Sequence, residues 1–136
     1  MTVDEILLVD DSIEDSEILA RLLDDAGFSQ NMVVVSDPLQ ALAMLDGKTG
    51  TQLSRRTLIL LDIGLPHMSG LDLAGQIRMR PEWSHAPIVM LTESANPEHV
   101  IAAKNHNVAG YVLKQKLDES LQNQSATLAQ LLGSPG

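Results

Sequence analysis

The sequence contains no cysteine, and its only aromatic side chains are Phe28, Trp83 and Tyr111. Without cysteine the chain can form no disulfide bond, no catalytic thiolate and no zinc site built from thiolates. Aromatic side chains are what many proteins use to stack the bases of single-stranded nucleic acid. Their scarcity therefore argues against that kind of binding surface.

Positively charged residues are also few. The chain has 9 Lys and Arg residues against 18 Asp and Glu residues, so its net charge is −9. A protein that binds the phosphate backbone of DNA normally has the opposite balance, so we expect no DNA partner. The N-terminus lacks the basic region of a secretory signal, and no apolar run approaches the roughly 20 residues of a membrane span. We therefore expect a cytoplasmic protein with no membrane partner.

Length and hydrophobic content are those of one small globular domain. The chain has 136 residues, of which 44% are hydrophobic, enough to bury a core of its own. The predicted secondary structure extends almost to the last residue, which leaves no room in this chain for a second, effector domain. We therefore expect a single domain over residues 1–136.

Short apolar runs alternate with amphipathic segments along the chain. The apolar runs predict strands buried on both faces at residues 3–9, 32–35, 57–62, 88–92 and 110–114. The amphipathic segments predict a helix that Ser12 caps at its N-terminus and Gly27 ends. They also predict helices from Pro38 to Leu45, from about Ser69 to before Pro81, at 96–107 and at 117–132. A strand and a helix that alternate five times predict an α/β fold, in which five helices cover both faces of a parallel sheet.

The third apolar run, 57–62, ends abruptly in an acid, Asp62. Gly64 and Pro66 follow directly, and these residue types mark a loop rather than a longer strand. Asp62 is therefore expected at the carboxyl end of a central strand, which is where open α/β sheets bind their ligands. This position makes Asp62 the leading candidate for a functional residue.

Other predicted strands also end in polar residues: Asp10 and Asp11 follow the first, Thr92 ends the fourth and Lys114 ends the fifth. Taken singly, each is more often a cap, a turn residue or a solvated edge residue. In a parallel sheet, however, all these ends lie on one edge, so their coincidence indicates a site. Carboxylates gathered there would repel one another, and a hard divalent cation such as Mg²⁺ relieves that repulsion. We expect Asp10, Asp11 and Asp62 to hold Mg²⁺.

The same set of residues suits the transfer of a phosphoryl group. One carboxylate, Asp62, can act as the nucleophile. Mg²⁺ and the Lys114 ammonium would neutralise phosphoryl oxygens, and the Thr92 hydroxyl would donate to another. The backbone carbonyl of Gly64 is expected to add a metal ligand, because glycine lets the chain approach an ion closely.

Four segments contain these polar residues, and Ser69 and Gly70 follow the second of them: Ile6-Leu7-Leu8-Val9-Asp10-Asp11-Ser12, Leu60-Leu61-Asp62-Ile63-Gly64-Leu65-Pro66, Val89-Met90-Leu91-Thr92 and Tyr111-Val112-Leu113-Lys114. Together they resemble the response regulator receiver domain of bacterial two-component signalling, and the resemblance extends over residues 3–132. It implies a flavodoxin-like fold, a three-layer sandwich whose strands have the order 2-1-3-4-5.

The resemblance also implies a role for each site residue. Asp62 would accept a phosphoryl group from a histidine kinase, while Asp10 and Asp11 hold Mg²⁺. Lys114 would contact the phosphoryl group, and Thr92 and Tyr111 would form the switch pair. Such a protein is not an enzyme in the usual sense, since it catalyses only its own phosphorylation and dephosphorylation.

The predicted partners follow from the same resemblance. The long loop at 47–56 and the turn at 81–87 resemble stand-alone regulators that serve bacterial phytochrome kinases, so we expect a kinase of that type. The output would be binding to a downstream target, relay of the phosphoryl group to a phosphotransfer protein, or a homodimer through the face at 96–132.

The sequence departs from the family pattern at three positions. Leu65 stands where the family usually has Met, and Glu93 where a small residue usually follows the Thr. Gln115 replaces the Pro that usually follows the Lys, so the shape of that loop does not follow from the resemblance.

Two other functions compete with this interpretation. A metal-dependent phosphatase or phosphotransferase that acts on small molecules would also use an aspartyl phosphate. It typically needs a second acid two residues after the nucleophile, and here that residue is Gly64. A degenerate receiver that serves only as a scaffold would not need the full set of Asp, Thr and Lys residues.

Overall fold

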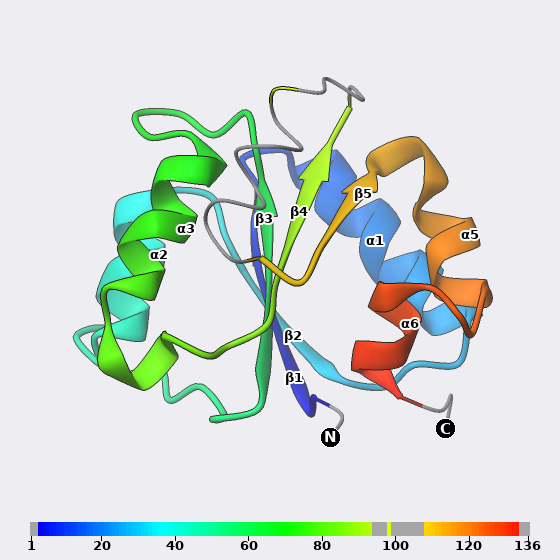
Figure 1. Ribbon diagram of the computed structural model, residues 1–136, viewed down its shortest axis with the longest axis horizontal. Coiled ribbons are helices and arrows are strands. Elements are labelled where there is room, and N and C mark those ends of the chain that lie inside the picture. Colours follow the sequence, from blue (N-terminus) through cyan, green and yellow to red (C-terminus); the bar gives the residue numbers. More distant parts are fainter. Residues whose placement is uncertain (1–2, 94–97, 99–107, 134–136) are drawn as a thin grey trace.

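Five parallel strands form the centre of the molecule (Figure 1). The computed structural model describes residues 3–93, 98 and 108–133. The strands are β1 (Glu5–Val9), β2 (Asn31–Val35), β3 (Thr57–Asp62), β4 (Ile88–Thr92) and β5 (Gly110–Leu113). They pair in the order β2-β1-β3-β4-β5, so β3 is the central strand and the predicted strand order is confirmed.

Helices cover both faces of this sheet. They are α1 (Ile13–Asp25), α2 (Pro38–Leu45), α3 (Gly70–Arg78), α5 (Leu117–Gln122) and α6 (Thr127–Leu132). In Figure 1, α2 and α3 lie on one side of the sheet, and α1, α5 and α6 lie on the other. Apart from residue 98, the helix predicted at 96–107 lies outside the described residues. Among the residues that are described, no helix is long and apolar enough to cross a membrane.

The sheet separates two hydrophobic cores, and β3 contributes to both. Ile59 and Leu61 point to the core under α2 and α3, whereas Leu58 and Leu60 point to the core under α1, α5 and α6. Every residue of β3 is buried. This is why the strand is an unbroken apolar run instead of an alternating one.

Side-chain caps begin α1 and α3 near the carboxyl edge of the sheet, and the cap at Ser12 is the predicted one. The Ser12 hydroxyl accepts a hydrogen bond from the Asp15 N–H at 3.1 Å, and the Ser69 hydroxyl accepts one from the Asp72 N–H at 3.1 Å. Each cap satisfies a backbone donor that has no partner within the first turn. At the far end of α1, Gly27 has a φ of 86° and ends the helix.

The prediction of one continuous helix at 117–132 is wrong, because α5 and α6 are separate helices. Asn123 leaves the helical conformation, with φ −87° and ψ 107°, and its side chain accepts a hydrogen bond from the Ser125 N–H at 3.0 Å. Such local bonds replace those of a continuing helix. The break still leaves Leu121 and Leu128 buried in the same core. The leucines therefore keep a helical spacing across Asn123, although the backbone leaves the helical conformation there.

The turn before β4 is held to the end of α2. It contains a short 3₁₀ helix, Pro81–Trp83, and the buried Trp83 indole N–H donates to the Leu45 carbonyl at 2.8 Å. The predicted turn at 81–87 is thus an ordered structure, and its Trp83 ring packs in the core under α2 and α3.

Candidate functional site

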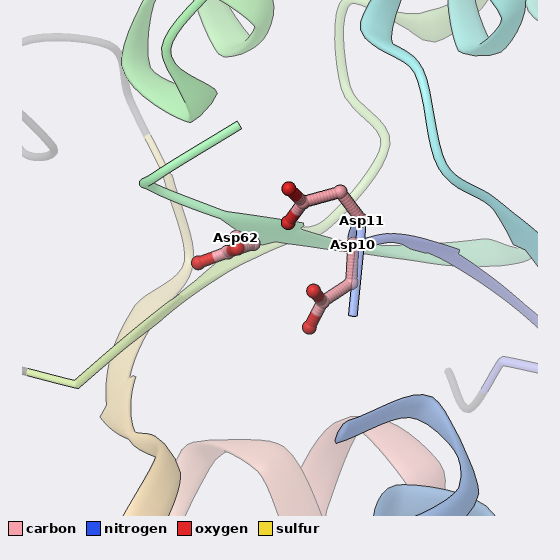
Figure 2. A group of neighbouring side chains, drawn as sticks. All are labelled: Asp10, Asp11 and Asp62. Atoms are coloured by element: carbon pink, nitrogen blue, oxygen red, sulfur yellow. The ribbon is translucent and has the colours of Figure 1, made fainter. Parts of the chain in front are cut away.

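The ends of β1 and β3 bring three carboxylates together. Val9 and Leu61 are paired across the two strands, so the residues that follow them, Asp10 and Asp62, are neighbours. One carboxylate oxygen from each of Asp10, Asp11 and Asp62 lies within 4.8 Å of the other two (Figure 2). The cluster predicted from the sequence therefore forms at the predicted edge of the sheet.

These carboxylates differ in their exposure to water. Asp10 and Asp62 are 3% and 8% exposed, whereas Asp11 lies at the surface. Burial raises the pKa of Asp62, and the nearby charge of Asp10 raises it further, while the Lys114 ammonium opposes the change. The surroundings of Asp62 thus compensate the negative charge of its carboxylate only in part.

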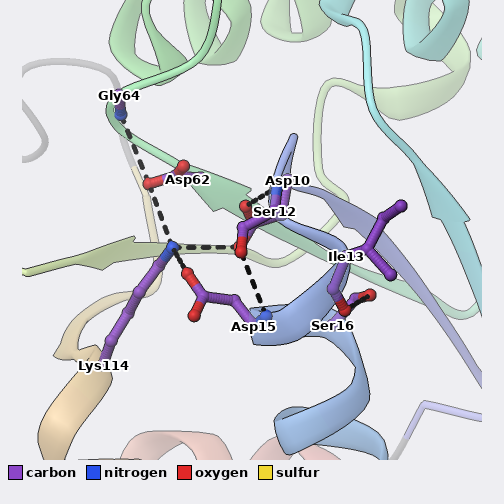
Figure 3. Close-up of polar contacts among 8 residues, drawn as sticks. All are labelled: Asp10, Ser12, Ile13, Asp15, Ser16, Asp62, Gly64 and Lys114. Atoms are coloured by element: carbon purple, nitrogen blue, oxygen red, sulfur yellow. Dashed lines mark hydrogen bonds and ion pairs between the residues drawn. The ribbon is translucent and has the colours of Figure 1, made fainter.

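Lys114 provides the compensating positive charge. It begins a 3₁₀ turn, Lys114–Lys116, directly after β5, one residue beyond the end of the strand. Its ammonium nitrogen lies 3.0 Å from Asp10 Oδ2, 2.7 Å from Asp15 Oδ2 and 3.6 Å from Asp62 Oδ1 (Figure 3). Burial lowers the pKa of Lys114, but the hydrogen bonds to Asp15 and Asp10 outweigh burial and raise the pKa well above its usual value. The side chain is therefore charged at neutral pH.

Thr92 ends β4, the strand beside β3, and is buried. It lines an open cavity of about 490 Å³ together with Asp62, Gly64 and Lys114. The rim of this cavity is acidic, since Asp11 lines it as well. Asp62, Thr92 and Lys114 thus line one space that is large enough for a phosphoryl group. They are the predicted nucleophile, hydroxyl donor and positively charged side chain.

Two glycines shape the loop after β3. The Gly64 N–H donates to Asp62 Oδ1 at 3.3 Å, which holds the backbone of this loop beside the carboxylate. The Gly70 N–H donates to the Ile63 carbonyl at 3.0 Å. A Cβ atom on Gly70 would overlap the carbonyl oxygen of Asp62, so α3 can begin this close to β3 only with glycine there. That the Gly64 carbonyl is a metal ligand stays a prediction.

Tyr111 lies on β5, opposite Met90 of β4. Its ring is partly buried and packs against the core under α2 and α3. The described residues that line the cavity with Thr92 do not include Tyr111. Its role as the partner of Thr92 in a switch therefore stays a prediction. Apart from residue 98, the segment at 96–107 lies outside the described residues.

Comparison with known proteins identifies this arrangement. The family model of the response regulator receiver domain matches residues 6–125. The chain belongs to the response regulator receiver family. The receiver is 34% identical over 112 residues to the response regulator Rcp1 of Synechocystis, covering 82% of this chain and 76% of Rcp1.

Solved structures agree with this membership. The receiver superimposes on the Mn²⁺-bound form of Rcp1 with a TM-score of 0.79 and 28% identity, covering 98% of this chain and 99% of that one. The bacteriophytochrome response regulator RtBRR matches with a TM-score of 0.79 and 31% identity, covering 96% of this chain and 78% of its own. The resemblance to the receiver fold and to phytochrome regulators is confirmed.

The sequence pattern indicates Ser12 only as a helix cap, and it indicates no role for Asp15. In the receiver, the Ser12 N–H donates to Asp10 Oδ1 at 2.9 Å, and Asp15 makes the shortest contact with Lys114. The sequence separates Asp15 from Lys114 by 99 residues, so only the fold could join them. The one local signal was the position of Asp15 in the first turn of a helix that follows a strand-end acid pair.

Two of the three residues that depart from the family pattern, Glu93 and Gln115, directly follow site residues in the chain. Glu93 is exposed and lines the cavity, where it adds to the negative charge of the rim. Gln115 is the middle residue of the 3₁₀ turn that Lys114 begins. The turn holds the Lys114 ammonium among the carboxylates without a proline at this position.

Proposed function

We propose that this receiver accepts a phosphoryl group on Asp62 from a histidine kinase in a Mg²⁺-dependent reaction. The observation that supports this proposal most strongly is the meeting of three carboxylate oxygens within 4.8 Å beside a lysine ammonium at the end of the central strand. Receiver domains are signalling modules, so the product is a modified protein rather than a released metabolite.

The donors at this edge fit a magnesium ion. Asp10, Asp11 and Asp62 offer carboxylate oxygens of the kind that Mg²⁺ prefers, and the exposed Asp11 leaves one side of the cluster open to water. When bound, Mg²⁺ neutralises the charge on phosphoryl oxygens. In support of this assignment, the related regulator Rcp1 has a solved form with bound Mn²⁺.

The chain's own residues then carry the transfer. A carboxylate oxygen of Asp62 forms a bond to phosphorus as the bond between phosphorus and the kinase histidine nitrogen breaks, and that nitrogen keeps the electron pair. The Lys114 ammonium, 3.6 Å from Asp62 Oδ1, is close enough to pair with a phosphoryl oxygen. Thr92 lines the same cavity, and its hydroxyl donates to another phosphoryl oxygen.

The kinase partner is proposed to be of the phytochrome type. This rests on the similarity to RtBRR, a bacteriophytochrome response regulator, at 31% identity over 96% of this chain. The phosphorylated receiver would then act by binding a downstream protein, or by passing the phosphoryl group to a phosphotransfer protein.

Mass spectrometry after treatment with acetyl phosphate and Mg²⁺ tests the acceptor residue. The wild type is expected to gain one phosphoryl group, and Asp62→Asn is expected to gain none at this site, because an amide is not a nucleophile toward phosphorus. Asp25→Asn, which removes an exposed acid from the far end of α1, is the matched control and should be labelled like the wild type. Normal labelling of Asp62→Asn would contradict the assignment.

A further inference from the structure

Asp15 stands beside the proposed phosphorylation site but outside the carboxylate cluster. It lies in the first turn of α1, where the Ser12 hydroxyl accepts a hydrogen bond from its N–H at 3.1 Å. Its Oδ2 atom accepts a hydrogen bond from the Lys114 ammonium at 2.7 Å, the shortest of the three ion-pair contacts that this group makes with described residues. Figure 3 shows Lys114 reaching between Asp62, Asp10 and Asp15.

The contacts of Asp10 create a conflict between Lys114 and a metal ion. Asp10 Oδ1 accepts from the Ser12 N–H at 2.9 Å, and Asp10 Oδ2 accepts from the Lys114 ammonium at 3.0 Å. A divalent cation that binds beside Asp10 would meet a positive charge already in place. If Asp10 and Asp62 both turned to the metal ion and Lys114 had no other acceptor, a nearly buried ammonium would be left unpaired, which is costly.

Asp15 resolves this conflict, because it is an acceptor for Lys114 that does not belong to the carboxylate cluster. We propose that Asp15 is a positioning residue, which keeps the Lys114 ammonium within reach of a phosphoryl group on Asp62 while it frees Asp10 for the metal ion. This inference rests on the proposed function. It predicts that Asp15 strengthens Mg²⁺ binding by acting through Lys114 rather than as a ligand.

Glu14 is a matched control for Asp15. The two residues are adjacent in the same turn of α1, both line the cavity, and both carry one negative charge. In the described part of the chain, Lys114 is paired with Asp10, Asp15 and Asp62, and not with Glu14. Neutralising either residue therefore removes the same charge from the cavity, but only one change releases the lysine.

Titration calorimetry with Mg²⁺ measures the effect without any phosphoryl transfer. Asp15→Asn is expected to raise the dissociation constant for Mg²⁺ about tenfold, which is typical when a residue that supports metal ligands is lost. Glu14→Gln is expected to raise it by only about twofold, because an exposed charge at the rim is screened by salt. Asp15→Glu, which keeps an acceptor for the lysine, should restore the wild-type value within about twofold.

A double-mutant cycle separates an action through Lys114 from a direct electrostatic effect. In a Lys114→Gln background, Asp15→Asn should change the dissociation constant by about twofold or less, like Glu14→Gln. The melting temperatures of all variants in EDTA show whether each is folded, and a Lys114→Met background repeats the cycle with a second side chain. If Asp15→Asn still weakens binding about tenfold in both backgrounds, Asp15 does not act through the lysine.

The outcomes for the wild type and for the variants are distinguishable. A wild-type protein that binds no Mg²⁺ would refute the proposed function and this inference with it. A wild-type protein that binds Mg²⁺, together with equal effects of Asp15→Asn and Glu14→Gln, would leave the proposed function standing and would overturn the role of Asp15 alone.

Discussion

Asp62 has to be charged in order to act as a nucleophile, yet only 8% of the residue is exposed to water. Burial raises its pKa above the ordinary value of 3.8, which means that the folded protein holds the carboxylate less favourably than the unfolded chain does. The site therefore weakens the fold in the absence of a cation, as functional sites often do.

The first prediction is that Asp62→Asn stabilises the cation-free protein at neutral pH. Because the folded pKa is raised, the ionised carboxylate disfavours folding at pH values above the folded pKa, and this penalty is absent below 3.8. The melting temperature of Asp62→Asn in EDTA should exceed that of the wild type at pH 7, and the difference should shrink as the pH falls toward 3.8. A lower melting temperature than the wild type at pH 7 would contradict this account.

The second prediction concerns the close approach of Gly70 to Asp62. Since a Cβ atom at Gly70 would meet the carbonyl oxygen of Asp62, Gly70→Ala should lower the free energy of unfolding by about 1–3 kcal/mol in urea denaturation. Gly64→Ala is the control, because a Cβ at that position meets nothing within 4 Å. Equal stabilities of the two variants would show that the start of α3 is not held against β3.

At the scale of the element, apolar periodicity and caps predicted most of the fold. The strand at 57–62 is evident from its unbroken apolar run because both of its faces are buried, and the position of Ser12 before an amphipathic segment predicts its cap. The leucines on both sides of Asn123 keep a helical spacing, so the apolar pattern does not predict the break. A local hydrogen bond to the Asn123 side chain replaces the bonds of a continuing helix there. The pairing of Asp15 with Lys114 depends on the tertiary fold, which local patterns do not specify.

The third prediction is that Thr92 transmits the phosphorylation signal to β5 and the helices after it. A phosphoryl group on Asp62 would draw the Thr92 hydroxyl inward by a charge-assisted hydrogen bond, and Tyr111 would then occupy the space beside β4. Thr92→Ala should still be phosphorylated, but its association with itself or with a partner should no longer respond.

Sedimentation with and without a phosphoryl mimic measures this response. Thr51→Ala, at an exposed position in the 47–56 loop, is the control and should respond like the wild type. If Thr92→Ala associates as strongly as the wild type when the mimic is added, the switch does not use Thr92.

At the scale of the whole molecule, the acidic cluster and the net charge of −9 link the stability of the protein to its cations. A ligand that binds only the folded state stabilises it by RT ln(1 + L/Kd), where L is the free ligand concentration, so the stabilisation grows with the logarithm of that concentration even after the site is saturated. The fourth prediction is that Mg²⁺ at about 100 times its dissociation constant raises the melting temperature by about 5–10 °C.

Two variants distinguish this effect from general screening by salt. Asp11→Asn should lose most of the rise, whereas Glu17→Gln, which removes an exposed acid on α1, should keep it. Sodium chloride at the same ionic strength serves as a further control. A similar rise in both variants would mean that Mg²⁺ acts by screening and does not bind at the carboxylate cluster.

Transfer of a phosphoryl group from a histidine kinase tests the central claim most directly. A phytochrome-type kinase labelled on its histidine would be mixed with the wild type and with Asp62→Asn, each in Mg²⁺ and in EDTA. We expect the label to move to the wild type only, and only in Mg²⁺, because both the Asp62 carboxylate and the cation are required. Equal transfer to Asp62→Asn, or transfer that is unaffected by EDTA, would contradict the assignment of Asp62 as a Mg²⁺-dependent phosphoryl acceptor.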